Sequence, residues 1–432
     1  MNLIIMPLKK IAKLLFNRIF YVAVALLIQL VWVFLFVWEL AGYSQYISLG
    51  ITVLSIVMVL WILNKRINPS YKLGWTMLIM AFPVFGLLLY LLFGHSRIAE
   101  EMQKRYARVQ EDSVPYLQSD PEVCRRIQEE DPSAAVQSEY ICRHSVYPVY
   151  EHTKAEYFQV GDDMFPVLVK ELEQAEHYIY IEYFIINDGV MWRTILDILE
   201  QKAAQGVDVR LIYDGFGCLT TLPYKYDKFL REKGIQCKVF NPFRPVLNII
   251  QNNRDHRKIC VIDGKTGFTG GINLADEYIN QKERFGHWKD TAVMLKGDAV
   301  WSMTMMFLHM WNVVNGIQTP IDYAAHSPHA YHPEEFEGSG FVQPFTDTPL
   351  DGETLGENVY LNIINRAKRY VYICTPYLII DNEMMTALCL AAKSGVDVRI
   401  MTPGVPDKKM VFLLTQSYYA QLIRSEERRV GK

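Results

Sequence analysis

The stretch NRDHRKICVIDGKTGFTGGINLADEY, residues 253–278, decides the fold of this chain. Within it, His256, Lys258 and Asp263 stand in the spacing H-x-K-x-x-x-x-D. Side chains two residues apart leave the same face of a strand, so we expect the imidazole and the ammonium to lie together. The apolar run 259–262 predicts a strand buried on both faces, and the Asp-Gly pair after it predicts a hairpin turn.

The side chains of this hairpin suit attack on a phosphodiester without a metal ion. A neutral imidazole is a nucleophile near neutral pH, and a lysine ammonium holds a phosphate as a point charge. Asn273 can donate hydrogen bonds to a non-bridging oxygen, and the pair Gly270-Gly271 lets the backbone approach a ligand. A carboxylate would fix the tautomer of the histidine and stabilise its imidazolium form. The alternative is a structural histidine with solvated basic neighbours, but the complete pattern is more specific than any single residue.

The stretch resembles the HKD signature of the phospholipase D superfamily, and the sequence around it resembles that of bacterial cardiolipin synthases. The similarity extends from the third apolar segment of the chain to about Ser425. It implies an α/β fold in which N-terminal transmembrane helices precede a phospholipase D-like α/β/α sandwich domain and a second copy of that domain. It also implies a site that pairs two HKD motifs and uses no cofactor or metal. One histidine becomes the phosphohistidine, and the other acts as general acid and then as base.

The residues predicted to form the site lie on the hairpin or just after it: His256, Lys258 and Asp263 as the catalytic motif, Lys258 and Asn273 as phosphate-binding residues, and Gly270, Gly271 and Asp290 as supporting residues. The resemblance implies that Asp290 is the carboxylate that hydrogen-bonds His256, while Asp263 steadies the hairpin. A surface carboxylate is an equally weighted alternative for Asp290.

Composition bounds the class of protein. With 432 residues the chain has room for two or three domains. Hydrophobic residues make up 50% of it and the mean hydropathy is +0.04, which favours a membrane part. The net charge of −3 provides no basic field, so no nucleic-acid partner is expected. The seven cysteines stand singly, without C-x-x-C or zinc-ligand spacing, so neither a disulfide framework nor a metal site is indicated.

Three uncharged runs within residues 1–96 predict a membrane region: 19–38, 46–63 and 73–93. The first is long enough to span a bilayer, and the two later runs make a cleaved signal peptide its weaker interpretation. A buried soluble hairpin is the alternative for the second and third runs. We therefore predict a multi-pass protein of a bacterial cell membrane. The side that carries the catalytic part stays open, because basic residues flank the runs on both sides.

After the membrane region, strand and helix patterns alternate, which predicts a mixed sheet with helices on its faces. The expected strands are 178–186, 207–213 and 234–240, and the expected helices are 165–175, 192–204, 224–232 and 299–312. The expected domain plan is a polar connector at 97–157, a first phospholipase D-like domain at 158–318, a linker at 319–340 and an incomplete second domain at 341–432. The linker contains three regularly spaced histidines, which we interpret as linker residues rather than metal ligands.

The second half of the chain repeats the first. The sequence GVDVR at 206–210 recurs at 395–399, and the strand that precedes each copy reads Tyr-Ile-Tyr-Ile or Tyr-Val-Tyr-Ile. Such self-similarity predicts two fused copies of one domain. The histidine of the first motif follows the first GVDVR by 46 residues (256 − 210), and the same interval in the second copy leads past Lys432. We therefore expect a single HKD motif here, and the charged ending predicts a truncated reading frame or, alternatively, a frayed natural terminus.

These observations predict a membrane phosphatidyltransferase that makes cardiolipin and glycerol from two phosphatidylglycerol molecules through a phosphohistidine. Its expected partners are phosphatidylglycerol and membrane lipids. One alternative is another phospholipase D-type phosphatidyltransferase or hydrolase. The other is an inactive membrane subunit, because the second motif is missing. Oligomeric state, acyl preference and the identity of the histidine that attacks first stay open.

Overall fold

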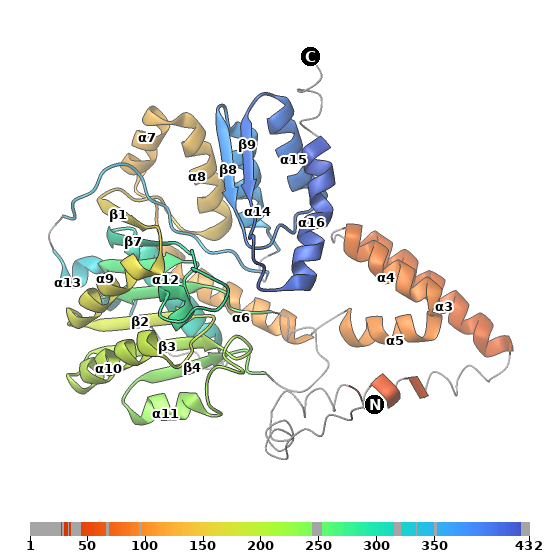
Figure 1. Ribbon diagram of the computed structural model, residues 1–432, viewed down its shortest axis with the longest axis horizontal. Coiled ribbons are helices and arrows are strands. Elements are labelled where there is room, and N and C mark those ends of the chain that lie inside the picture. Colours follow the sequence, from red (N-terminus) through yellow and green to blue (C-terminus); the bar gives the residue numbers. More distant parts are fainter. Residues whose placement is uncertain are drawn as a thin grey trace. The chain divides into compact units, whose positions relative to one another are not determined.

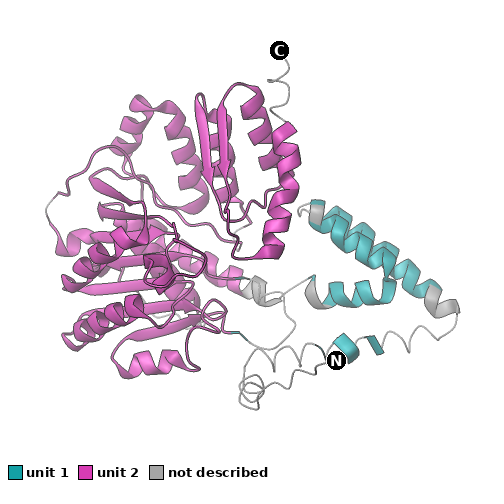
Figure 2. Ribbon diagram, in the orientation of Figure 1, with its two compact units in different colours: residues 1–101, 243–253 teal, residues 102–242, 254–432 magenta. Residues whose placement is uncertain are grey.

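The computed structural model describes most of the chain, in seven stretches: residues 45–65, 69–94, 97–243, 253–314, 321–333, 335–349 and 352–424, with a few positions between 27 and 35. The chain divides into two compact units, which Figure 2 colours separately. The first contains residues 1–101 and 243–253, and the second contains residues 102–242 and 254–432. Most of the first apolar run, 19–38, lies outside the described residues.

The described part of the first unit is helical, with α3 (Gln45–Asn64), α4 (Pro69–Ala81) and α5 (Pro83–Phe93). Helix α3 covers the second apolar run. The run 73–93 is not one helix, because Pro83 removes a backbone donor and breaks the run at Phe82; it then serves as the first residue of α5. Within the described residues, no helix combines the length and apolar character that crossing a membrane requires. The transmembrane helices therefore stay a prediction.

The second unit contains a seven-stranded sheet in the order β1-β7-β6-β5-β2-β3-β4 (Figure 1). Its strands are β1 (Thr153–Phe158), β2 (Tyr178–Tyr183), β3 (Asp208–Asp214), β4 (Gln236–Phe240), β5 (Lys258–Ile262), β6 (Thr266–Gly270) and β7 (Ala292–Gly297). Strands β2, β3 and β4 pair in parallel, whereas β2 pairs with β5, and β5, β6, β7 and β1 pair in turn, antiparallel. The predicted mixed sheet is confirmed, and the HKD hairpin (β5–β6) lies at its centre.

Helices cover both faces of this sheet, as an α/β/α sandwich requires. On one face α9 (Gly161–Glu173) and α10 (Val190–Ala204) pack on alternate residues of β2, including Ile179, Ile181 and Tyr183. On the other face α12 (Val300–Val313) packs on the residues between them, Tyr178 and Tyr180. The remaining helical elements of this copy are short: α11 (Tyr226–Glu232) and η3 (Asp276–Ile279).

The structure differs from the sequence-based expectations in four details. Strand β1 begins at Thr153, inside the predicted connector, and β7 was not predicted at all. Strand β2 ends at Tyr183, three residues before the predicted end. The predicted linker is folded against the sheet, because Tyr178 Oη donates to the backbone oxygen of His326 at 2.9 Å and His329 lies 3.0 Å from the carboxylate of Asp298. That segment contains η5 (Ala324–His326) and α13 (Pro328–Tyr331).

The predicted connector contains helices: α6 (Arg97–Ser113), η1 (Val114–Tyr116), α7 (Pro121–Glu130) and α8 (Pro132–Ser145). Two of them begin at an aspartate followed by a proline, which is a strong helix start. The Asp131 carboxylate accepts from the backbone N–H groups of Ser133 and Ala134 at 2.9 and 3.0 Å, and Asp120 does the same for Glu122 at 2.8 Å.

The second copy repeats the strand–helix–strand unit of the first. It contains α14 (Leu355–Arg366), β8 (Tyr370–Cys374), α15 (Asn382–Lys393), β9 (Asp397–Met401) and α16 (Lys409–Arg424). Strand β8 pairs in parallel with β9, and Tyr370 lies opposite Asp397 just as Tyr178 lies opposite Asp208 in the first copy. The identical register confirms the predicted repeat. In the described residues the sheet of the second copy has two strands.

Candidate active site

His256 and Lys258 meet at the start of β5, as their spacing predicts. The Lys258 Nζ atom lies 3.1 Å from His256 Nδ1 and donates to the backbone oxygen of His256 at 2.5 Å. The lysine is buried and the histidine is solvent-exposed. The ring of Phe184 lies beside both, with its centroid 4.7 Å from that of His256 and 5.5 Å from Lys258 Nζ. An imidazole thus faces solvent with an ammonium held against it.

The electrostatics of this pair favour a neutral imidazole. Burial of part of its ring and the positive charge of Lys258 lower the pKa of His256 below its ordinary value. Burial also lowers the pKa of Lys258 to about 8, although the carboxylates of Asp255 and Asp290 act against that shift. Near neutral pH the site therefore holds an unprotonated nucleophile next to a cation that can bind an anionic oxygen.

Asp290 enters the site through a gap left by a glycine. A Cβ atom on Gly271 would lie 2.1 Å from Asp290 Oδ1, so only glycine admits the carboxylate there. Burial raises the pKa of Asp290, and the positive charge of Lys258 opposes the rise. Asp290 Oδ1 accepts from the backbone of Thr291 at 2.8 Å. The structure thus brings Asp290 close to Lys258 and gives it no hydrogen bond to His256, the partner that the sequence predicts.

Gly270 is required by the backbone. Its φ is +151° and a Cβ there would lie 2.4 Å from the backbone oxygen of Thr291, so β6 approaches β7 too closely for a side chain. The predicted role of the two glycines was close approach to a ligand. In the structure they admit the β7 backbone and the Asp290 carboxylate.

Asp263 lies at the other end of β5 from His256. The five residues of β5 lie between them, and at about 3.3 Å per residue this strand is roughly 17 Å long. Its carboxylate accepts hydrogen bonds from the backbone N–H groups of Glu176, His177 and Tyr178 at 2.8, 2.7 and 2.9 Å. These bonds fix the hairpin to the start of β2, which is the steadying role that the family resemblance implies for Asp263. Its membership in the catalytic motif stays a prediction.

Asn273 is buried and already hydrogen-bonded. Its Oδ1 accepts from the backbone of Ile185 at 3.0 Å, and its Nδ2 donates to Tyr278 Oη at 2.8 Å. One amide hydrogen remains for the phosphate oxygen that the sequence predicts as its partner. The first bond fixes the segment after the glycine pair to the chain just after β2, and the second links it to η3.

The sequence analysis missed the charged residues that flank His256. Asp214, at the end of β3, accepts from the backbone of Asp255 at 3.1 Å and lies 3.5 Å from the guanidinium of Arg254. The signal was present in the letters RDHR, where acidic and basic residues surround the histidine. The second copy also reaches the site: the charge of Lys408, just before α16, contributes to the lowered pKa of His256.

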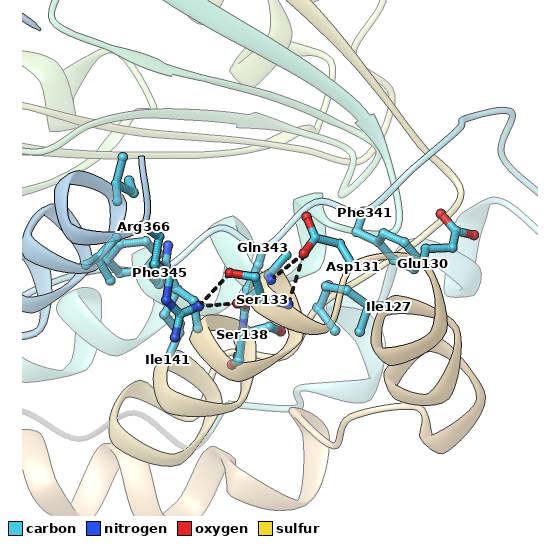
Figure 3. Close-up of a pocket in the computed structure, with 15 residues that line it drawn as sticks. Ile127, Glu130, Asp131, Ser133, Ser138, Ile141, Phe341, Gln343, Phe345 and Arg366 are labelled. Carbon is cyan, nitrogen blue, oxygen red and sulfur yellow. Dashed lines mark hydrogen bonds between the residues drawn. The ribbon is translucent and has the colours of Figure 1, made fainter. Parts of the chain in front are cut away.

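A separate pocket of about 750 Å³ lies among α7, α8, α14 and the segment 341–345 (Figure 3). Ile127, Phe341 and Phe345 form part of its apolar wall. Arg366 donates to the backbone oxygen of Ser133 at its rim. None of the lining residues comes from the sheet edge that carries His256, so the pocket is not part of this site.

The fold and the site together define a phospholipase D-like α/β protein with one histidine–lysine motif at the centre of its first sheet. A family model described as "Cardiolipin synthase, PLD-like domain" matches residues 168–311 and 360–431. A second model, "Phospholipase_D-nuclease N-terminal", matches residues 53–95.

Individual proteins are also similar to this chain. A cardiolipin synthase from a Geobacillus strain is 33% identical over 397 residues, which cover 90% of this chain and 76% of that protein. An uncharacterized protein of Streptococcus mutans serotype c is 44% identical over 365 residues, 84% of this chain and 78% of that one. The crystal structure of a Haemophilus influenzae phosphatidylserine synthase aligns with a TM-score of 0.47 at 15% identity, over 68% of this chain and 74% of that one. The chain belongs to the cardiolipin synthase family of phospholipase D-like proteins and is a phosphatidyltransferase of that type.

Proposed function

We propose that this phosphatidyltransferase makes cardiolipin and glycerol from two molecules of phosphatidylglycerol, through a phosphohistidine at His256. The observation that carries the proposal is the contact between His256 and Lys258, which places a neutral imidazole at the solvent boundary with an ammonium 3.1 Å away. The names of the relatives, cardiolipin synthases among them, support the choice of lipid.

The proposed reaction has two displacements at phosphorus. In the first, an imidazole nitrogen of His256 attacks the phosphodiester of one phosphatidylglycerol. The bond to the terminal glycerol oxygen breaks, and glycerol leaves after taking up a proton. In the second, a terminal hydroxyl of another phosphatidylglycerol loses its proton and attacks the phosphohistidine. The P–N bond breaks, which releases cardiolipin and restores the imidazole.

Cationic and amide groups stabilise the charge on the phosphoryl oxygens in this scheme. Lys258 binds one non-bridging oxygen as a point charge, and the unused amide hydrogen of Asn273 binds a second. Asp290 keeps Lys258 charged despite its burial, because a carboxylate near a lysine favours the ammonium form. Asp263 acts at a distance, by holding the hairpin that carries the histidine. The family resemblance assigns the proton transfers to a second HKD histidine, and the given sequence contains one such motif.

The proposal also attaches the chain to a membrane through its first unit. Large apolar side chains of α3 are exposed, among them Leu49, Val53 and Leu60. The buried cluster of this unit is small and centres on Ile62 and Ile79. Contiguous exposed apolar surface of this kind marks membrane or protein contacts, and a lipid substrate favours the membrane.

Replacing the nucleophile tests the proposal. In His256→Asn, formation of cardiolipin from labelled phosphatidylglycerol should fall by about 10³-fold or more, because the covalent route is lost. The matched control is His144→Asn, an exposed histidine on α8, which should retain wild-type activity. Retained synthesis in His256→Asn would exclude the proposed mechanism.

An inactive lipid-binding subunit is the second candidate, because the exposed apolar side chains of α3 would serve lipid binding equally well. Purified chain incubated with phosphatidylglycerol vesicles would then bind them without forming acid-labile phosphohistidine. A hydrolase is separated from a transferase by product analysis: phosphatidic acid in place of cardiolipin, with or without an added alcohol, identifies water as the acceptor.

A further inference from the structure

A buried charged triad lies directly beside the histidine in sequence and has no part in the chemistry above. Arg257 Nη2 lies 2.5 Å from Oε1 of Glu182, and Arg257 Nε lies 3.0 Å from Oδ1 of Asp255. Glu182 is wholly buried in the middle of β2, and Asp255 is buried just before β5. One guanidinium therefore bridges a residue of the central strand and a residue of the loop that carries His256.

The triad holds the loop from the face opposite the site. Glu182 shares its face of β2 with Tyr178 and Tyr180, which pack against α12. Arg257 also lies toward that helix, because its positive charge contributes, after burial, to the low pKa of His309 of α12. Side chains alternate along an extended chain, so anchoring residue 257 on the α12 face turns residues 256 and 258 to the other face.

The carboxyl groups of Glu182 and Asp255 have pKa shifts in opposite directions. Burial raises the pKa of Glu182, whereas Arg257 lowers the pKa of Asp255 against the effect of its own burial. Arg257 therefore faces one carboxyl group whose ionised form is favoured, that of Asp255, and one whose ionised form is disfavoured, that of Glu182. The planar fork of a guanidinium contacts both carboxyl groups in one orientation, whereas a lysine ammonium supplies only a point charge.

Two further contacts hold the part of this loop that precedes His256. The backbone N–H of Asp255 donates to Oδ2 of Asp214 at 3.1 Å, and Arg254 Nη1 donates to the backbone oxygen of Asn241 at 3.1 Å. Arg254 and Asp255, the two residues that precede His256, are thereby attached to the sheet or its edge. The position of the imidazole follows from its neighbours, because among the described residues its ring has a polar contact with Lys258 and a ring contact with Phe184.

We propose that Arg257, anchored by Glu182 and Asp255, is a positioning residue that holds His256 and Lys258 against each other. The inference rests on the proposed function, in which His256 is the nucleophile, and it deepens that function by naming what orients the nucleophile. Arg257 touches no reacting atom. It acts through the backbone that it shares with its two neighbours.

The test measures the state of His256 directly, without turnover. Full-length protein in detergent is treated with diethyl pyrocarbonate over a range of pH, and modification of the peptide that contains His256 is followed by mass spectrometry. Its pH dependence gives the pKa of the imidazole, which Lys258, Asp255 and Lys408 face in the folded protein. In Arg257→Lys the pKa of His256 should rise by at least about 0.5 unit, because Lys258 is no longer held against the ring.

Arg210→Lys is the matched control. Arg210 lies on the neighbouring strand β3, its side chain is 19% exposed like that of Arg257, and it pairs with Asp208 at 2.8 Å. This variant should leave the pKa of His256 unchanged, with a similar change in the midpoint of thermal unfolding. If Arg257→Lys does not fold, Glu182→Ala removes one of the two anchors without removing a charge that acts on the imidazole of His256, and it carries the same expectation.

Two outcomes overturn the proposal: an unchanged pKa of His256 in the folded Arg257 or Glu182 variant, or an equal shift in Arg210→Lys. Where the enzyme turns over, kcat should fall about 10-fold or more in Arg257→Lys with KM for the lipid unchanged, because binding groups are intact and orientation is lost. A chain with no synthase activity but with the expected pKa shift would contradict the proposed function and leave the positioning role standing.

Discussion

The two copies of the repeat have the same local chemistry and opposite exposure. Tyr178 and Tyr180 stack with ring centroids 4.5 Å apart, and Tyr370 and Tyr372 lie 4.8 Å apart. Tyr180 is fully buried, whereas Tyr372 is 54% exposed. The cause is α12, whose Phe307 stacks on Tyr180 at 4.7 Å. In the described residues of the second copy, no helix occupies the corresponding place.

The hydrogen bonds beneath these tyrosines are also duplicated. Tyr180 Oη donates to Asp208 at 3.0 Å and Tyr372 Oη donates to Asp397 at 2.8 Å. In each copy an arginine pairs with that aspartate and lies over the tyrosine ring, at 5.2 and 5.0 Å from its centroid. The tyrosine, aspartate and arginine thus form the same cluster in both strand pairs. The cluster becomes part of a hydrophobic core where a helix covers it, as α12 does in the first copy.

The largest expected difference lies in the tyrosine rings. Tyr180→Ala should lower the free energy of unfolding by about 3–5 kcal/mol, because a buried aromatic ring and its stacking partner are lost. Tyr372→Ala should cost under about 1 kcal/mol, because its ring is already in solvent. Urea unfolding of the purified chain measures both. Equal losses would mean that the exposed face of the second copy is covered in solution.

The second largest expected effect is a pH dependence of the free energy of unfolding, caused by His309 on α12. Burial and the nearby Arg257 lower the pKa of His309 to about 3. The unfolded chain binds a proton at this residue near pH 6.5 and the folded chain does not, so the stability it contributes is complete above that pH and is lost as pH falls toward 3. The loss should approach about 1.4 kcal/mol per pH unit between about pH 6 and pH 4.

His309→Gln should remove this slope while keeping a hydrogen-bonding group opposite Tyr147 Oη, which lies 3.3 Å from His309 Nδ1. The measurement is the free energy of unfolding at pH 7, 6 and 5, with His144→Gln as the exposed control. The second copy has no corresponding group among its described residues. A variant that keeps the wild-type slope would contradict the buried neutral state of His309.

The smallest expected difference lies in the aspartates. Asp208 accepts from Tyr180 Oη and from Gln236 Nε2 at 2.8 Å in a part-buried setting. Asp208→Asn should cost about 1–2 kcal/mol, and Asp397→Asn, at the exposed cluster, under about 0.5 kcal/mol. The same unfolding experiment resolves the two. A larger cost at Asp397 would reverse the order of the two copies.

Much of this fold could be predicted, because its signals are periodic or repeated. The spacing of His256 and Lys258 places both on one face of β5, and the recurring GVDVR announces a second strand pair. Strand β1 was missed because its four central residues are all exposed, so TKAEYF shows no apolar alternation. The apolar run 73–93 conceals the break at Pro83, because hydropathy alone does not report a missing backbone donor.

Parts of the site could not be predicted for a different reason. Asp263 is close to His256 in the motif, but a strand separates them in space, and its partners lie almost 90 residues earlier, at the start of β2. The missing side chain of Gly271, just after β6, makes room for the carboxylate of Asp290, just before β7. No local sequence pattern encodes this contact. The triad of Glu182, Asp255 and Arg257 also combines residues that are distant in the sequence. The letters RDHR show that charged residues flank His256, but they do not show that Arg257 contacts Glu182 on β2.

Strand β1 is synthesised long before β7, the strand with which it pairs. Phe158 pairs with Ala292 and Thr153 with Gly297, so the partner of β1 is translated more than 130 residues later (292 − 158 = 134). At roughly 5–20 residues per second, β1 waits about 7–27 seconds without its neighbour. Lys154 and Glu156 are exposed on this edge strand, and charges on an edge resist pairing with other chains. The polar residues that make β1 hard to predict from the sequence thus also oppose aggregation of the nascent chain until β7 pairs with β1.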